Sequence, residues 1–185
     1  MVGDFLRSRR YKWKAENIPD SDGKILYDIL VKNKYKNALE IGTSTGHSAV
    51  WIAWALRQTR GKLITIEIDK ERLERAKKNF KKAGVSQFIN PRYADAHDLV
   101  KELKGPFDFV FCDADKDWYI NYFKELYPKL KIGGCYTAHN VYGEESRYFM
   151  GGTSEFYKYI KKIKNLDTKI DRSGVGISIS YKRSE

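Results

Sequence analysis

The stretch "ALEIGTSTGHSAVWIAWAL", residues 38–56, decides the fold. It runs from an apolar strand through a turn that contains Gly42 and Gly46 into a helix. Glycines let the backbone turn tightly and bring the free amides of the helix N-terminus close to a ligand. Their spacing here is G-x-x-x-G, whereas dinucleotide sites have G-x-G-x-x-G. The stretch therefore disfavours a pyrophosphate cradle and, with it, an NAD-dependent oxidoreductase.

The rest of the chain alternates apolar strands with amphipathic helices. Strands are expected at 38–42, 62–68, 88–93, 107–112, 135–139 and 176–181. Helices are expected at 22–34, 46–58, 70–83, 97–104 and 117–130. This order predicts βαβ units. It therefore predicts an α/β fold of the Rossmann-like, doubly wound type, with a mostly parallel sheet and helices on both faces.

Two details refine this assignment. The helix at 70–83 has apolar residues at helical spacing, with Asp69 in position to cap its start and Gly84 in position to end it. Pro91 lies inside the third strand, where it removes a backbone donor. It therefore weakens that strand or places it at an edge of the sheet.

Length and composition indicate one soluble domain over residues 1–185, with 42% hydrophobic and 32% charged residues. No apolar run approaches the ~20 residues that cross a bilayer, and the N-terminus has no features of a signal peptide. Cys112 and Cys135 each lie in an apolar run, which is typical of buried thiols in a reducing compartment. We therefore expect a cytoplasmic protein without a membrane partner.

The net charge of +11 is compatible with an anionic partner such as RNA, with an acidic substrate, or with a solvated lysine-rich surface. Basic residues concentrate at 7–14, 70–82 and 158–169, and so are spread along the chain. This spread favours the solvated surface, because a nucleic-acid footprint is expected to gather on one face.

Polar residues and one glycine stand at the ends of five expected strands, where open parallel sheets bind their ligands. They are Glu40, Gly42, Glu67, Asp95, Asp113, His139 and Asn140. Glu40 repels a phosphate and suits a cationic ligand, while Glu67 is placed to accept hydrogen bonds from ribose hydroxyls. A ligand with a ribose, an amino group and a positive centre fits both acids, and S-adenosylmethionine is such a ligand. The alternative is that both acids are ordinary helix caps or surface groups.

Five segments appear in the order and spacing of the caffeoyl-CoA and catechol O-methyltransferase family. They are "LEIGTSTGHS", "ITIEID", "YADA", "FCDADKDWY" and "GGCYTAHNV", so the chain resembles this family from Ile18 to Val141. The segment "GVGISIS" looks like the family's last strand. The resemblance implies a class I S-adenosylmethionine-dependent O-methyltransferase with a seven-stranded sheet whose last strand is antiparallel. Its acceptor would be a small aromatic, catechol-like hydroxyl compound.

The resemblance also implies which residues bind the donor: Ile18, Glu40, Gly42, Thr43, Ser44, Ser48, Glu67, Asp95, Ala96 and Asp113. For Ser44 and Ser48 the alternative is a helix-capping role. In domain terms it implies an N-terminal helical or lid segment at 1–35 and a donor-binding core at 36–141. A substrate loop, a helix and the final strands would then occupy 142–185.

On the acceptor side the family carries a divalent cation and a lysine that acts as general base. Lys116 matches the lysine, Asp115 matches a residue that touches substrate, and Asp113, His139 and Asn140 match the metal ligands. Asp117 is expected to cap the helix that follows.

His139 departs from the family, which has a carboxylate at this position. An imidazole prefers softer ions than magnesium. Three interpretations stay open: a divalent metal, Mg²⁺ or a softer ion, bound by Asp113, His139 and Asn140; a metal-free reaction with His139 as general base; or a changed acceptor site. A changed site would take another substrate, whereas a decayed site would leave a protein that binds the donor without transferring its methyl group.

The family also includes enzymes that methylate hydroxyuridine in tRNA. The segment "FLRSRRYKWK" at 5–14 mixes basic and aromatic residues, which fits either contact with RNA or a lid or dimer arm. A substrate loop is expected within 142–164, with Gly151 and Gly152 as a possible hinge. We expect a homodimer, a packing or gating role for His47, and no defined role for His97.

Overall fold

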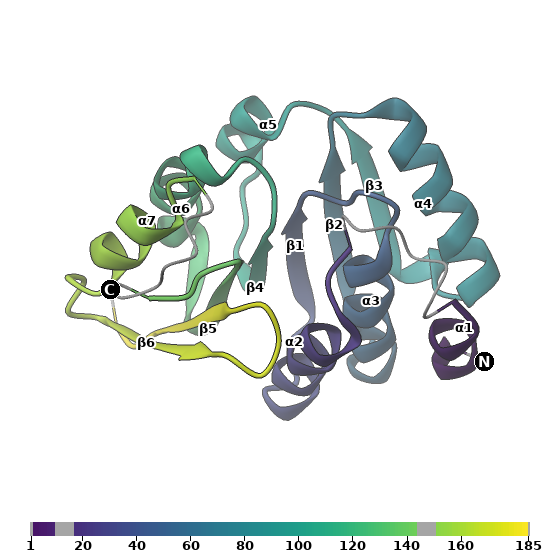
Figure 1. Cartoon of the computed structure of the whole chain (residues 1–185), viewed down its shortest axis with the longest axis horizontal. Coiled ribbons are helices and arrows are strands. Elements are labelled where there is room, and N and C mark those ends of the chain that lie inside the picture. The colour runs from purple at the N-terminus through teal and green to yellow at the C-terminus, as the bar shows by residue number, and fades with distance from the viewer. Residues whose placement is uncertain (1, 10–16, 144–150, 185) are drawn as a thin grey trace. The chain divides into compact units, whose positions relative to one another are not determined.

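The computed structural model describes residues 2–9, 17–143 and 151–184 (Figure 1). The chain divides into two compact units, residues 1–96 and 97–185. Residues 10–14 of the basic and aromatic segment at 5–14 and residues 144–150 of the expected substrate loop lie outside the described residues. The single-domain organisation and its three segments stay a prediction.

The first unit contains three parallel strands in the order β3-β2-β1. They are β1 (Asn37–Ile41), β2 (Lys62–Glu67) and β3 (Ile89–Tyr93). Its helices are α1 (Val2–Arg9), α2 (Asp20–Lys32), α3 (His47–Thr59) and α4 (Lys70–Ala83), with a 3₁₀ turn η1 (Ser86–Phe88). β3 is the edge strand, which confirms the prediction drawn from Pro91.

Helix packing in this unit follows the apolar faces of the sequence. α2 and α3 lie side by side (Figure 1), and α3 buries Val50, Ala53 and Leu56. α4 has the predicted bounds: the Asp69 carboxylate accepts a hydrogen bond of 3.0 Å from the Arg72 amide, and Gly84 ends the helix at φ 71°. Both terminal signals read from the sequence are thus confirmed.

The second unit contains four strands in the order β4-β5-β7-β6. They are β4 (Phe107–Cys112), β5 (Leu130–His139), β6 (Leu166–Asp171) and β7 (Ile177–Lys182). β4 and β5 are parallel, whereas β7 runs antiparallel to both β5 and β6. Its helices are α5 (Ala96–Glu102), α6 (Tyr119–Leu126) and α7 (Thr153–Ile160), with 3₁₀ turns η2 (Lys116–Trp118) and η3 (Tyr127–Lys129).

The structure confirms the predicted fold class: α/β, with seven strands, a mostly parallel arrangement and an antiparallel last strand. Two expectations were wrong in detail. The helix expected over 117–130 is split into η2, α6 and η3, and α6 ends ahead of Pro128, which has no backbone N–H to continue the helical hydrogen bonds. β6 was missed because the sequence "LDTKID" is polar, as befits the partly exposed edge strand that it forms.

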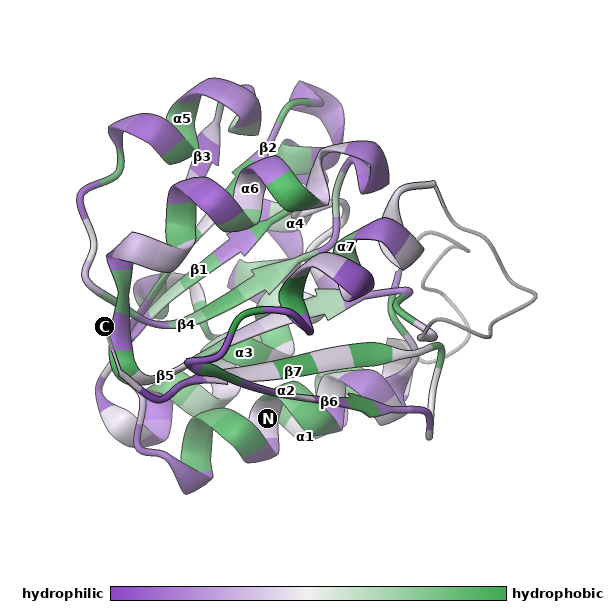
Figure 2. Ribbon diagram, turned by 90° about the vertical axis from the view of Figure 1, so that its left-hand side faces the viewer, coloured by the Kyte–Doolittle hydropathy of each residue, from purple (hydrophilic) through white to green (hydrophobic). Residues whose placement is uncertain are grey.

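The core of the second unit lies around β4 and β5. β4 is buried along its whole length and is coloured as hydrophobic over most of it (Figure 2). The rings of Phe123, Tyr136 and Phe156 contact one another on one face, with the Phe123 and Tyr136 centroids 5.0 Å apart. Cys112 and Cys135 are buried and free, as predicted, and burial raises the pKa of the Cys112 thiol to about 12. Within the described residues, no helix is long and apolar enough to span a membrane.

Candidate active site

The turn between β1 and α3 is fixed by backbone geometry. The amides of Gly42 and Thr43 both donate to the Ile66 carbonyl, at 3.0 and 3.1 Å. Gly46 adopts φ 91°, and a Cβ added there would lie 2.5 Å from the Phe80 ring. Only glycine tolerates both conditions, so this turn holds the N-terminus of α3 in one position.

Glu40 is the buried acid of this turn, with no exposed surface. The Thr65 hydroxyl donates to its Oε2 at 2.5 Å, and the Thr43 and Thr65 hydroxyls are themselves 2.5 Å apart. Burying a carboxylate is costly unless its charge is compensated. A positively charged group of a ligand would provide this compensation.

Glu67, at the end of the neighbouring strand, joins two loops. Its Oε2 accepts from the Ser44 amide at 2.6 Å and its Oε1 from the Asp69 amide at 3.0 Å. Ser44 adopts φ 47°, and its buried hydroxyl oxygen has no hydrogen-bond partner within the described part of the chain. A buried hydroxyl of this kind calls for an explanation, and a bound polar ligand supplies one.

Ile18 is held against α3 by His47. The imidazole Nδ1 lies 2.8 Å from the Ile18 carbonyl, Trp51 Nε1 donates to Nε2 at 3.3 Å, and Asp20 lies 3.3 Å from the same nitrogen. Burial lowers the pKa of His47, against the opposing effects of the Ile18 carbonyl and Asp20. His47 therefore packs as a neutral link between two segments, in agreement with the expected packing role.

The remaining donor residues of the first unit lie at the carboxyl ends of its strands. Ser48 is buried in the first turn of α3, Asp95 is exposed and Ala96 is buried. The Ala94 amide donates to the Glu67 carbonyl at 3.1 Å, so the segment that leads to Asp95 runs beside the end of β2. The structure thus gathers nine of the ten predicted donor residues in this unit; Asp113 belongs to the second unit, and its contact with the donor stays a prediction.

Two further residues at this edge were missed from the sequence. Ile68 and Tyr93 are large apolar side chains, yet they are 63% and 62% exposed. Ile68 follows Glu67 directly, and Tyr93 pairs with Glu67 in the register of β2 and β3. The sequence did offer one signal for this site: Ile68 is an apolar residue directly after the acid at a strand end. Such a side chain can pack on a flat ring of a ligand.

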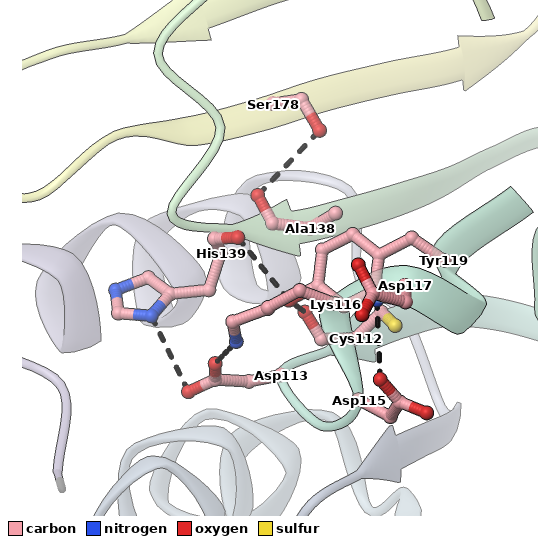
Figure 3. A network of polar contacts seen from close by, with 9 residues as sticks. All are labelled: Cys112, Asp113, Asp115, Lys116, Asp117, Tyr119, Ala138, His139 and Ser178. Carbon is pink, nitrogen blue, oxygen red and sulfur yellow. Dashed lines mark hydrogen bonds and ion pairs between the residues drawn. The ribbon is translucent and has the colours of Figure 1, made fainter. Parts of the chain in front are cut away.

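In the second unit, Asp113 lies between two basic side chains (Figure 3). The Lys116 ammonium is 2.5 Å from Asp113 Oδ1, and His139 Nδ1 is 3.3 Å from Asp113 Oδ2. The side chains of Asp113 and Lys116 are less than a fifth exposed, and that of His139 is 6% exposed. The structure therefore brings together three of the five residues predicted for the acceptor side.

The pKa of Asp113 reflects opposing effects. Burial raises it, but the hydrogen bond and charge of His139, followed by the charge and hydrogen bond of Lys116, outweigh burial and hold the pKa below its ordinary value. The carboxylate is thus ionised at neutral pH and anchors both bases.

Tyr119 helps to position the cluster of Asp113, Lys116 and His139 through its buried hydroxyl. Its hydroxyl lies 3.1 Å from the Cys112 carbonyl and 3.2 Å from the His139 carbonyl, so it joins the ends of β4 and β5. The Lys116 ammonium stands 5.2 Å from the centre of the same ring. Asn140 follows with φ 58°, a left-handed conformation that asparagine tolerates.

The role expected for Asp117 was wrong. Its Oδ1 accepts from the Gly152 amide at 2.8 Å, whereas Asp115 caps η2 by accepting from the Asp117 amide at 3.1 Å. Gly151 and Gly152 lie against this turn, and the hinge expected at these glycines stays a prediction. Asp115 also lies 3.4 Å from His97, whose ring stacks on Trp118 at 4.0 Å.

The predicted metal ligands do not fit a hard divalent cation in this arrangement. Both Asp113 oxygens already contact nitrogen atoms, one of them in the positively charged Lys116 side chain. Across residues 2–9, 17–143 and 151–184, no group of three His, Cys, Asp or Glu side chains is arranged to hold a metal ion. With His139 in the set, Asp113 is its only carboxylate, whereas Mg²⁺ prefers oxygen ligands.

Solved structures define the class of the fold. The O-methyltransferase TomG from Streptomyces achromogenes, solved with SAM, is 22% identical and covers 99% of this chain and 89% of its own, with a TM-score of 0.82. An O-methyltransferase from Bacillus cereus, solved with SAH, is 21% identical over 98% of this chain and 90% of its own, also at 0.82. The chain therefore has the fold of these O-methyltransferases.

Sequence comparison gives the family. A family model described as O-methyltransferase matches residues 6–170, and the chain belongs to this family. A catechol O-methyltransferase from Niastella koreensis is 37% identical over 69% of this chain, and a caffeoyl-CoA O-methyltransferase from Medicago sativa is 36% identical over 68%. The chain spans 59% and 53% of the length of these two relatives.

Proposed function

We propose that this protein is an S-adenosylmethionine-dependent O-methyltransferase that acts on the hydroxyl group of a small aromatic acceptor. Membership of the family supports the reaction class, and the named relatives support a catechol-like acceptor. The observation that carries the proposal is the pair of acids, Glu40 and Glu67, at the ends of adjacent strands beside a fixed glycine turn.

The donor site fits the parts of S-adenosylmethionine. Gly42, Thr43, Ser44 and Ser48 would hold its methionine portion, and Glu40 would face its positive charge. The Ser44 hydroxyl would gain the partner that it lacks among the described residues. When bound, this donor supplies a methyl group carried on a positively charged sulfur.

The nucleoside portion would lie at the ends of β2 and β3. Glu67 would accept hydrogen bonds from the ribose hydroxyls while its amide contacts keep it in place. Ile68 and Tyr93 would pack on the adenine, with Asp95 and Ala96 at its border. Ile18, which His47 holds, would cover the donor.

Methyl transfer also requires that the acceptor hydroxyl lose its proton. Because His139 Nδ1 faces Asp113, the lone pair of the neutral ring is at Nε2, and we assign Nε2 as the atom that takes this proton. Asp113 then stabilises the imidazolium, and Lys116 supplies positive charge for the developing aryl oxide. Asp115, near its His97 partner, would contact the acceptor.

The test is methyl transfer from labelled donor to catechol by the purified full chain, with EDTA, Mg²⁺ or Zn²⁺. The expected result is a methylated catechol whose rate of formation is unchanged by EDTA. Donor binding without transfer to any hydroxyl acceptor would overturn the enzyme proposal in favour of a donor-binding protein. Bulk tRNA is included as a second acceptor, because residues 1–96 carry most of the net positive charge of the chain.

A further inference from the structure

The positive charge of the chain is not evenly divided between its two units. Residues 1–96 contain 20 of the 35 Lys and Arg residues but 11 of the 24 Asp and Glu residues. The first unit therefore carries a formal charge of +9 out of +11. Charge asymmetry of this kind is typical of proteins with a polyanionic partner.

Within this unit, a row of cations lies where its three strands begin, at the edge opposite to Glu40 and Glu67. We call it the basic edge. Its members are exposed and belong to three segments, 32–36, 57–62 and 81–82: Lys32, Lys34, Lys36, Arg57, Arg60, Lys62, Lys81 and Lys82. None of the stretches 30–37, 56–63 and 80–90 contains an Asp or Glu residue.

Hydrogen bonds join the first two of these segments, and the Lys62 side chain reaches the 3₁₀ turn η1, which follows the third. The Lys62 amide donates to the Lys36 carbonyl at 2.7 Å, and the Thr59 hydroxyl donates to the Tyr35 carbonyl at 2.6 Å. The Lys62 ammonium binds the Gln87 carbonyl and stands 5.8 Å from the centre of the Phe88 ring. The basic edge thus extends over three adjacent strands, about 10 Å between the outer two.

Helix dipoles account for only half of these cations. Lys32, Arg57, Lys81 and Lys82 lie in or beside the last turns of α2, α3 and α4, where positive charge is favourable. Lys34, Lys36, Arg60 and Lys62 lie beyond the helix ends, on loops and at a strand start. These four cations repel one another, and the helix dipoles do not account for their presence.

Two of these four also occupy positions that normally belong to glycine. α2, α3 and α4 each end with a left-handed residue: Lys34 at φ 56°, Arg60 at φ 58° and Gly84 at φ 71°. In each case the next amide donates back to the last turn, from Tyr35 to Leu30, Gly61 to Leu56 and Val85 to Phe80. A side chain with a Cβ disfavours this conformation, so the chain keeps Lys34 and Arg60 there against their backbone preference.

We propose that the basic edge binds the phosphodiester backbone of a nucleic acid. It presents eight exposed cations on three neighbouring segments, without carboxylates between them in these segments. A membrane surface is a poorer partner, because interfacial binding needs exposed apolar side chains. The large ones among the described residues, Ile68, Tyr93 and Ile132, lie outside the basic edge. This proposal does not depend on the methyl-transfer reaction.

The test compares two double variants of the full chain. K34G/R60G removes two charges from the basic edge and relieves both left-handed positions, so its melting temperature is expected to equal or exceed that of the wild type. K161Q/K162Q removes two exposed lysines of the second unit as the matched control. Binding of fluorescent tRNA, a 20-nucleotide single-stranded RNA and a 20-base-pair DNA duplex is measured from 50 to 200 mM KCl.

The wild type is expected to bind at least one of these probes with a steep salt dependence, and the probe that binds most tightly identifies RNA or DNA as the source. K34G/R60G is expected to bind about 10-fold more weakly, with a salt slope shallower by about 1.4 for a single strand or 1.8 for a duplex. The control should stay within about 3-fold of the wild type, and the donor affinity should be unchanged in both. Equal losses in the two variants, no salt-dependent binding of any probe, or tighter binding to polyglutamate or anionic vesicles would each overturn the proposal.

Discussion

His139 Nδ1 lies 3.3 Å from Asp113 Oδ2, while the Lys116 ammonium lies 2.5 Å from Oδ1 of the same carboxylate. One buried carboxylate therefore orients two basic side chains, one from the end of β5 and one from the turn after β4. The resemblance drawn from the sequence predicts a carboxylate where this chain has His139. His139 thus places a base beside Asp113 where a second anion was expected. This difference has three consequences that can be measured.

The variant H139Q tests the proton acceptor. Glutamine keeps a polar side chain of similar reach but has no basic nitrogen, so kcat for catechol methylation is expected to fall by about 100-fold or more. Donor affinity, measured by calorimetry, should stay within a factor of two. An activity close to that of the wild type would instead assign the base role to Lys116.

The variant H139D tests whether the identity of residue 139 decides metal dependence. It adds a second carboxylate beside Asp113, and like charges at this distance favour a bound cation. The variant is expected to be at least about 10-fold more active in Mg²⁺ than in EDTA, since a metal ion can take over the activation of the hydroxyl. The wild type should be indifferent to EDTA; a wild type that EDTA silences would show that Asp113, His139 and Asn140 bind a metal after all.

The variant D113N tests the electrostatic role of the carboxylate through the pH dependence of stability. The pKa of Asp113 is held below its ordinary value of 3.8 in the folded chain, so its contribution is fully present above that value. As the pH falls through the lower folded-state pKa, the contribution is lost. Near neutral pH, D113N is expected to lower the free energy of unfolding by about 2 kcal/mol.

Urea unfolding of both proteins between pH 7 and pH 2 checks this prediction. The difference in unfolding free energy should be constant above about pH 4 and shrink below it. Asp167, an exposed acid paired with Arg183, offers the control D167N, for which a far smaller change is expected because exposed ion pairs contribute little. A D113N difference that persists to pH 2 would contradict the assigned direction.

Much of the fold and of the donor side could be predicted because the signals are local. A glycine turn, a capping aspartate and a proline act within a few residues of themselves, and the structure bears out Gly42, Gly46, Asp69, Gly84 and Pro91. Residues at the ends of parallel strands also follow from strand order alone. This is why Glu40 and Glu67 lie where the sequence indicates.

The parts that could not be predicted depend on contacts between distant segments. Asp117 was expected to cap the next helix, but the Gly152 amide, 35 residues away, takes its carboxylate. The ion pairs of Asp113 with Lys116 and His139 result from side-chain geometry, for which sequence spacing gave only the candidates. The basic edge was read as dispersed charge because its three segments are distant in sequence and meet only in the folded unit.

The variant E67A tests the donor site. It removes the acceptor for ribose hydroxyls and for two backbone amides, so donor affinity is expected to fall by about 30-fold or more, equivalent to about 2 kcal/mol. Calorimetric titration with S-adenosylhomocysteine measures the loss. E71A, at an exposed position of α4, is the matched control and should bind as the wild type does. If E67A bound S-adenosylhomocysteine as tightly as the wild type, Glu67 would not be a donor-binding residue.

The variant G46A tests the turn that positions α3. A methyl group there would lie 2.5 Å from the Phe80 ring in a backbone with φ 91°, so both strain and overpacking apply. The free energy of unfolding is expected to fall by about 2–4 kcal/mol. G133A is the matched control, because Gly133 also has a left-handed φ of 77° but nothing within 4 Å of an added Cβ. It should lose only the backbone part, about 1–2 kcal/mol. Equal losses in the two variants would mean that Phe80 yields, and that the turn owes its position to the backbone alone.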